Sequence, residues 1–129
     1  MRIATLALSA ALVLWSGAAL AADAMANTYG NTVTAKSVKT GMTSKFYFNQ
    51  DGTYSVDAPG ADGKVVGAKG TWSTKDDGKT LCLSPTAAAD GGSPPPPVCS
   101  PVDMHGVGDT WSLTNSQGEN YEVSIIAGR

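Results

Sequence analysis

Apolar and polar residues alternate along most of the chain from residue 31 onward, in short segments separated by Gly, Asp, Asn and Pro. Because neighbouring side chains of an extended strand point to opposite faces, this alternation is typical of strands with one buried face. No segment in this part of the chain has apolar residues at helical spacing. We therefore expect about eight short strands, at residues 31–36, 45–49, 53–57, 65–74, 80–84, 98–104, 110–114 and 121–127.

Turn-forming residues join several neighbouring strands directly. Asp51-Gly52, Asp77-Gly78 and residues 115–120 each separate two alternating segments, and such sequences form tight hairpins. Consecutive hairpins produce an antiparallel meander, which in a domain of this size must curl to cover its apolar face. We expect an all-β domain in which the meander closes into a small barrel, with a two-layer sandwich as the alternative.

Large aromatic residues recur at equivalent places in these segments. A turn former, Thr, an aromatic residue and Ser follow one another at residues 52–55, 70–73 and 109–112. Alternation puts these rings, and those of neighbouring strands, on the face that we expect to point inward. The predicted core aromatics are Phe46, Phe48, Tyr54, Trp72, Trp111 and Tyr121. A stacking platform for sugars or bases is the alternative, but the chain has little else to fill a core.

The two cysteines, Cys82 and Cys99, flank a segment rich in Ala, Gly and Pro. In an exported protein such a pair is expected to form a disulfide, and the spacing lacks the close approach of a redox pair. Alternation turns Cys82 away from Leu81 and Leu83, so the bridge should lie on the outer face. Residues 85–97 should form a flexible tethered loop, whose run of prolines favours an extended spacer over a proline-rich ligand for a partner domain.

Residues 1–21 have the composition of a secretory signal peptide, with a positive start, an apolar run and small residues before Ala22. The apolar run is shorter than the ~20 residues of a membrane anchor, which is the alternative. We expect cleavage after Ala21, no membrane span afterwards, and one monomeric domain at residues 22–129 in the periplasm or outside the cell. The formal net charge of −2 becomes −3 without Arg2, which argues against nucleic-acid binding.

The single histidine, His105, lies between Asp103 and Asp109 and follows Ser100. A hydrolase of the Ser-His-Asp kind needs a nucleophile against the imidazole and a carboxylate behind it. In an extended segment, however, Ser100 would point away from the face shared by Asp103 and His105. The cluster also offers a metal ion no fourth ligand. We keep Asp103, His105 and Asp109 as a candidate polar cluster, and expect no catalytic set, no metal and no cofactor.

Several short motifs follow one another in order through the domain. They are GNTVT, FYFNQDGTYSV, GTWS, DGKTLCLSP, PVCSPV, VGDTW and VSIIAGR, and they span residues 30–129. In this order the chain resembles uncharacterised small exported proteins of Gram-negative bacteria, of the domain-of-unknown-function type. The resemblance implies a β domain and an envelope location, and it implies no activity. The long insertion between the cysteines departs from the compact spacing expected of that type.

These observations favour an exported, non-enzymatic β-barrel that binds or supports something in the cell envelope, either an envelope protein or a small ligand. The alternative is a protein similar to the inhibitors of lysozyme, which are small exported barrels that insert a loop into an enzyme cleft. This analogy is one of fold, and Lys69-Gly70 or the loop after Cys82 would be the inserted segment. A second alternative is a small hydrolase that uses His105.

Overall fold

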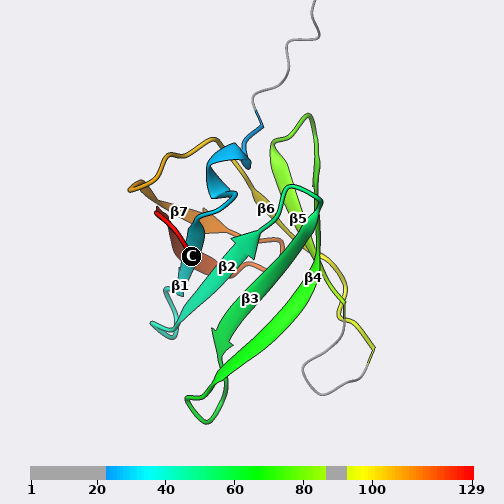
Figure 1. The fold of residues 1–129 in the computed structure, drawn as a ribbon. Coiled ribbons are helices and arrows are strands. Elements are labelled where there is room, and N and C mark those ends of the chain that lie inside the picture. The colour runs from blue at the N-terminus through cyan, green and yellow to red at the C-terminus, as the bar shows by residue number, and fades with distance from the viewer. Residues whose placement is uncertain (1–22, 87–92) are drawn as a thin grey trace, which may run out of the picture.

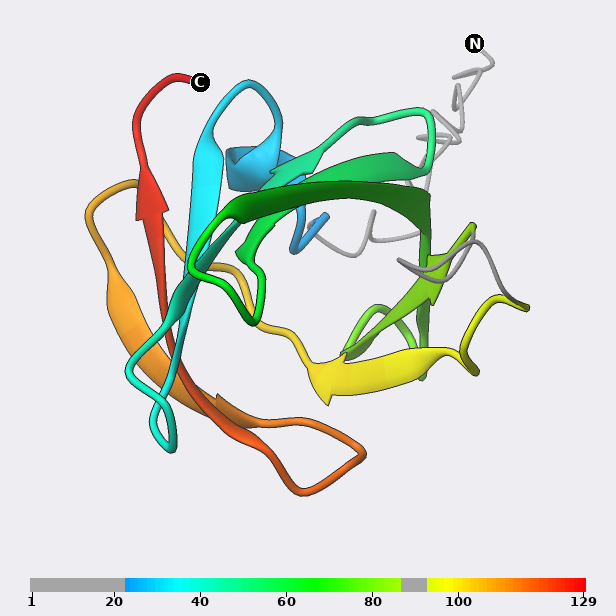
Figure 2. The same ribbon diagram turned by 90° about the horizontal axis from the view of Figure 1, so that it is seen from below.

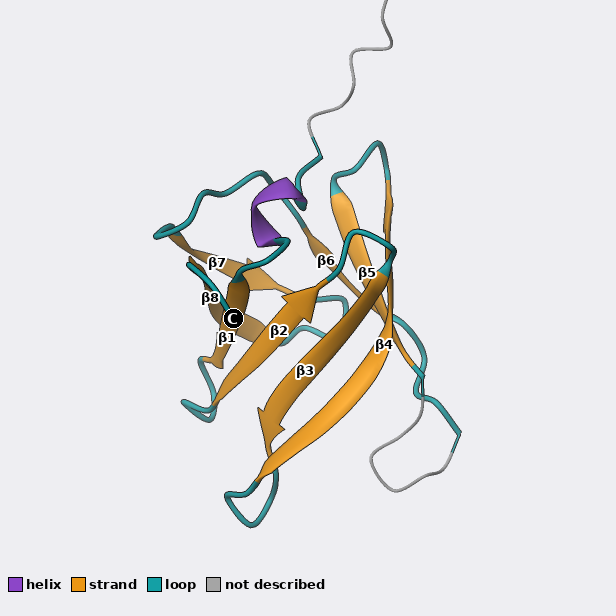
Figure 3. Ribbon diagram, viewed as in Figure 1, coloured by secondary structure: helices purple, strands orange, loops and turns teal. Residues whose placement is uncertain are grey.

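The computed structural model describes residues 23–86 and 93–129. The predicted signal peptide and the middle of the predicted loop, residues 87–92, lie outside these described residues. The described part is almost entirely β, with one short 3₁₀ helix (Figure 1, Figure 3). The elements are η1 (Ala26–Thr28), β1 (Thr32–Ser37), β2 (Thr43–Phe48), β3 (Thr53–Pro59), β4 (Val65–Lys75), β5 (Thr80–Pro85), β6 (Val98–Pro101), β7 (Thr110–Thr114) and β8 (Asn120–Ile126).

The strands form one antiparallel sheet in the order β6-β5-β4-β3-β2-β1-β8-β7. Since β1 pairs with both β2 and β8, the sheet curls into a nearly closed up-and-down barrel (Figure 2). The predicted all-β barrel is thereby confirmed, and the sandwich alternative is not what forms. Only the seam between β6 and β7 lacks a strand ladder in the described part of the chain, and there the Ser116 N–H donates to the Cys99 carbonyl at 2.7 Å.

Every predicted strand is present, but the sixth ends earlier than expected. Residues 102–104 were predicted as its continuation, whereas β6 stops at Pro101. Proline has no N–H to donate to a strand ladder. The last backbone hydrogen bond on this side runs from the Val102 N–H to the carbonyl of Lys79, the residue before β5, at 2.9 Å. From there the chain must cross the end of the barrel to reach β7, so the extended pattern cannot continue.

Three of the aromatic residues on the inward face pack together on β2 and β3. Phe48 and Tyr54 are 3% and 5% exposed, and Phe46 packs against both at ring-centroid distances of 5.9 and 6.2 Å. The other three predicted core aromatics, Trp72, Trp111 and Tyr121, are partly buried and pack against the same core. Rings packed at such distances add to the stability gained by burying their apolar surface.

Gly70 is a buried residue of β4, at a position where there is no room for a side chain. It pairs with Tyr54 on β3, and a Cβ atom at this position would lie 2.7 Å from the Tyr54 ring and 2.4 Å from the Ser84 carbonyl oxygen. The ring therefore rests directly against the backbone of β4. This contact explains the glycine of the GTWS motif.

The segment before β1 forms a cap that the sequence pattern does not predict. It contains η1, and Met25 at its N-terminal side is 1% exposed, inserted into one end of the barrel. The Thr28 hydroxyl donates to the Met25 carbonyl at 2.7 Å. Asp23 accepts two bonds of 2.9 Å, from the Met25 N–H and from the Tyr29 hydroxyl. A single 3₁₀ turn is too short to show helical periodicity, which is why it was missed.

The predicted disulfide between Cys82 and Cys99 is confirmed. The two cysteines face each other on β5 and β6. Their neighbours Leu83 and Val98 line the interior, so the bridge lies on the outer face, as alternation predicts. It fastens the shortest strand of the barrel, which forms one side of the seam.

Replacing Gly70 by Ala should destabilise the fold by about 2–3 kcal/mol, because the new methyl group meets a backbone carbonyl and a packed ring. Gly67→Ala, on the same strand, is the matched control: its Cβ would lie 3.7 Å from the nearest atom, a carboxylate oxygen of Asp57. Urea unfolding measures both. Equal stability of the two variants would contradict the contact described here.

Removing the disulfide in a Cys82→Ser, Cys99→Ser variant should lower the free energy of unfolding by about 3 kcal/mol, since the unfolded chain regains the entropy of the open loop. Urea unfolding under oxidising conditions gives the difference. Under reducing conditions the variant and the parent protein should unfold at similar urea concentrations. A parent protein unaffected by reductant would contradict this expectation.

Alkaline pH should weaken the cap. Burial, followed by the hydrogen bond and charge of Asp23, raises the pKa of Tyr29 to about 12, from an ordinary value of 10.0. Between these pH values the unfolded chain loses the proton first, so the free energy of unfolding should fall as pH rises from 10 to about 12. The fall, followed by urea unfolding at each pH, should be smaller for Tyr29→Phe. An equal fall in both proteins would refute this role.

A candidate ligand-binding cavity inside the barrel

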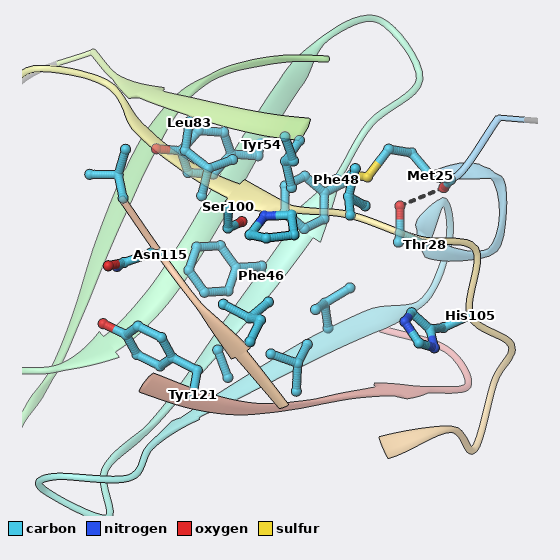
Figure 4. Close-up of a pocket in the computed structure, with 18 of the residues that line it drawn as sticks. Met25, Thr28, Phe46, Phe48, Tyr54, Leu83, Ser100, His105, Asn115 and Tyr121 are labelled. Carbon is cyan, nitrogen blue, oxygen red and sulfur yellow. Dashed lines mark hydrogen bonds between the residues drawn. The ribbon is translucent and has the colours of Figure 1, made fainter. Parts of the chain in front are cut away.

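The interior of the barrel is not filled by its side chains. A cavity of about 300 Å³ runs along the barrel between η1 and the opposite end. Its walls are the inward faces of the strands, and they are mostly apolar (Figure 4). The alternation that builds the sheet therefore also builds the cavity, since every inward residue faces either the core or this space.

One end of the cavity is closed by the cap. Met25 and Thr28 lie at this end, together with His105 from the segment that crosses between β6 and β7 (Figure 4). The Asn27 side-chain amide donates to the His105 carbonyl at 2.9 Å, which ties the cap to that segment. The Thr28 hydroxyl already donates to the Met25 carbonyl. This end therefore presents a sulfur atom, methyl groups and the His105 ring to the space.

The opposite end carries polar groups, and Figure 4 shows Asn115 and Tyr121 together there, away from Met25. Glu119 links them: it accepts from the Asn115 amide at 3.1 Å and from the Tyr121 hydroxyl at 3.3 Å. The Asn115 side-chain oxygen accepts from the backbone N–H groups of Gln117 and Glu119, both at 3.0 Å. The turn between β7 and β8 thus fixes the Asn115 amide so that its donor points at the carboxylate.

Burial raises the pKa of Tyr121, and the charge of Glu119 and the hydrogen bond to it raise it further. The phenol consequently stays protonated well above neutral pH and remains a donor to Glu119. The polar groups at this end of the cavity therefore form a small network around the exposed carboxylate of Glu119.

Five of the six predicted core aromatics contribute to the cavity wall, which makes them both core and candidate binding residues. They are Phe46, Phe48, Tyr54, Trp111 and Tyr121. Trp72 lies outside the wall, between Tyr29 and Phe48 at centroid distances of 6.1 and 6.4 Å, and its indole N–H donates to the Asn49 carbonyl at 2.9 Å. Trp72 therefore braces the cap.

The candidate polar cluster is brought to the barrel but is not arranged as a catalytic set. The His105 ring stacks flat on Trp111, at a centroid distance of 3.6 Å and an interplanar angle of 5°. Asp109 turns its carboxylate to the Gly106 N–H at 2.7 Å. Within residues 23–86 and 93–129, no hydrogen bond joins the His105 ring to Asp103, Asp109 or Ser100.

The expectation that Ser100 points away from Asp103 and His105 was wrong. All three line the same cavity. Strict alternation holds only while the chain stays extended, and the chain leaves the strand after Pro101, which changes the direction of every later side chain.

Among residues 23–86 and 93–129, no three His, Cys, Asp or Glu side chains are grouped closely enough to hold a metal ion. No helix there is long and apolar enough to cross a membrane.

A second hollow, of about 550 Å³, lies along the β6–β7 seam. Trp111, Leu113 and Tyr121 contribute to both this hollow and the interior cavity. The seam and the interior are consequently separated by a single layer of side chains.

The sequence pattern predicts the aromatic residues of the cavity wall, but it does not predict the cavity itself. Met25 and Thr28 were missed because they lie before the first alternating segment, where a single Met between two alanines shows no periodicity. Glu119 and Asn115 were read as turn residues, and they do form the turn. Their position at the cavity follows from closure of the barrel.

The chain was compared with protein-family models, with curated proteins and with solved structures, and none of the three comparisons finds a match. The resemblance to small exported proteins of Gram-negative bacteria therefore stays a prediction.

Proposed function

We propose that this chain is an exported, non-enzymatic binding protein that holds a small, largely apolar ligand inside its β-barrel. The observation that carries the proposal is the apolar interior cavity of about 300 Å³, closed at one end and polar at the other. An eight-stranded barrel is just wide enough either to be filled by side chains or to hold one small ligand. Here the side chains leave the space open.

The size and chemistry of the cavity set the kind of ligand. Small-molecule sites in proteins usually measure about 300–1,000 Å³, are mostly apolar and carry a few convergent polar groups. This cavity lies at the lower end of that range, which suits a short alkyl chain or a molecule of two or three aromatic rings. Transfer of such a group from water supplies the affinity, at roughly 25 cal/mol per Å² of apolar surface buried.

The stacking of His105 on Trp111 supports a binding role over hydrolysis. A general base must reach the proton of its nucleophile, whereas this imidazole lies flat against an indole ring, held at 3.6 Å between centroids. The ring extends the cavity wall. Its role in this proposal is to add a flat surface beside the ligand.

Export is supported by two independent features. The disulfide on the outer face suits an oxidising compartment, and residues 1–21 have the composition of a signal peptide. The proposed ligand is accordingly one available in the periplasm or outside the cell.

Filling the cavity should abolish binding without unfolding the barrel. Ala35 lies on β1 opposite Ser44 on β2 and Val123 on β8, and all three line the space. An Ala35→Phe variant should bind the neutral apolar dye N-phenyl-1-naphthylamine at least about tenfold more weakly than the parent protein, because the new ring occupies the dye's volume. Dye fluorescence measures affinity, and circular dichroism confirms the fold.

The matched control is Ser73→Phe, which adds the same ring at an exposed position on the outer face of β4. Its affinity for the dye should equal that of the parent protein. Failure of the folded parent protein to bind the dye would refute the proposed function, as would equal loss of binding in both variants.

A further inference from the structure

We infer that the cavity selects amphiphiles whose head group is cationic or a neutral hydrogen-bond donor, and that it discriminates against carboxylates. This inference rests on the proposed function. It concerns the head group alone, whereas the apolar walls decide whether any ligand enters.

The charges around the cavity are of one sign. Its lining includes two carboxylates, Asp103 and Glu119, and no Lys or Arg among the described residues. An anionic head group would therefore meet a carboxylate and no fixed cation to offset the repulsion. A cationic or uncharged donor meets no such barrier.

Glu119 has hydrogen-bonding capacity left for a ligand. One of its oxygens accepts from the Asn115 amide and the other from the Tyr121 hydroxyl. A carboxylate has about four acceptor positions, so each oxygen can take a further donor. Because Glu119 is exposed, a head group bound there keeps part of its hydration, and a charged one is not buried at great cost.

Two donors beside Glu119 already bind it. The Asn115 amide, whose oxygen accepts from two backbone N–H groups, directs one of its own N–H groups to Glu119, and the Tyr121 hydroxyl donates there as well. A ligand carboxylate would have to compete with Glu119 for these two donors, which leaves it only the second N–H of the Asn115 amide in this network. The network thus offers acceptors to a ligand more readily than donors.

The closed end offers the head group fewer partners. The Thr28 hydroxyl already donates to the Met25 carbonyl, the Met25 side chain is almost fully buried, and the His105 ring lies flat against Trp111. An apolar tail fits this end, since burying it there leaves no polar group unpaired. The ligand should therefore lie with its tail toward Met25 and its head group toward Glu119. Figure 4 shows Met25 at one end of the cavity and Asn115 and Tyr121, the partners of Glu119, at the other.

Three probes that share one alkyl chain separate the contributions of tail and head group. Octylamine, octanol and octanoate are titrated at neutral pH and low salt against the full chain loaded with N-phenyl-1-naphthylamine, and dye displacement gives their affinities. We expect octylamine to bind about tenfold more tightly than octanoate, with octanol between them, as one charge–charge interaction near a protein surface allows.

A Glu119→Gln variant keeps the size of the side chain and removes its charge, so the preference for octylamine over octanoate should fall by about threefold. Glu122→Gln is the matched control. It removes the same charge three residues further along, on β8, but this side chain faces outward, beside Ser112 and Lys36, and it should leave the preference unchanged.

The outcomes distinguish this inference from the proposed function. If octanol binds but octanoate binds as tightly as octylamine, the head-group inference fails and the binding function stands. A preference that is the same in the parent protein and in Glu119→Gln also overturns the inference. If the folded parent protein does not bind the dye, or if none of the three probes displaces it, the proposed function itself fails.

Discussion

The close approach of the Tyr54 ring to the backbone at Gly70 is the contact on which the interior of this barrel depends. A glycine at this one position lets β3, β4 and β5 meet around the ring, where any side chain would reach the Ser84 carbonyl. Tyr54 then packs with Phe46 and Phe48 as one layer on β2 and β3. Because these large rings are held against that wall, the space enclosed with the smaller residues of β1 and β8 stays open.

The two ends of that space differ because two unrelated pieces of chain meet them. Before β1, a single 3₁₀ turn inserts Met25 into the barrel, and the Thr28 hydroxyl of this turn donates to the Met25 carbonyl. Between β7 and β8, a tight turn places Asn115 and Glu119 at the opposite end with acceptors to spare. The cavity consequently has a direction, apolar toward one end and polar toward the other, which a simple gap in the packing would lack.

Alternation in the sequence was enough to predict the strands, the inward aromatics and the outward disulfide, because in a strand one dihedral pattern decides every side chain's direction. It failed at Asp103 and His105, since the chain bends after Pro101. It also missed the η1 cap, whose single turn is stabilised by contacts with Asp23 and by burial. A cavity is the difference between the volume that a backbone encloses and the volume that side chains fill, so no local pattern of residues encodes it.

The incomplete seam has a consequence for how molecules could reach the interior. β7 is paired on one side only, while β6 across from it is held by a covalent bridge to β5. Transient opening at this edge breaks fewer hydrogen bonds than opening between any two paired strands, and a locally cheap opening is also the most frequent one. The seam is therefore the side of the barrel that opens at the lowest cost, and a small ligand would enter there while the rest of the sheet stays folded.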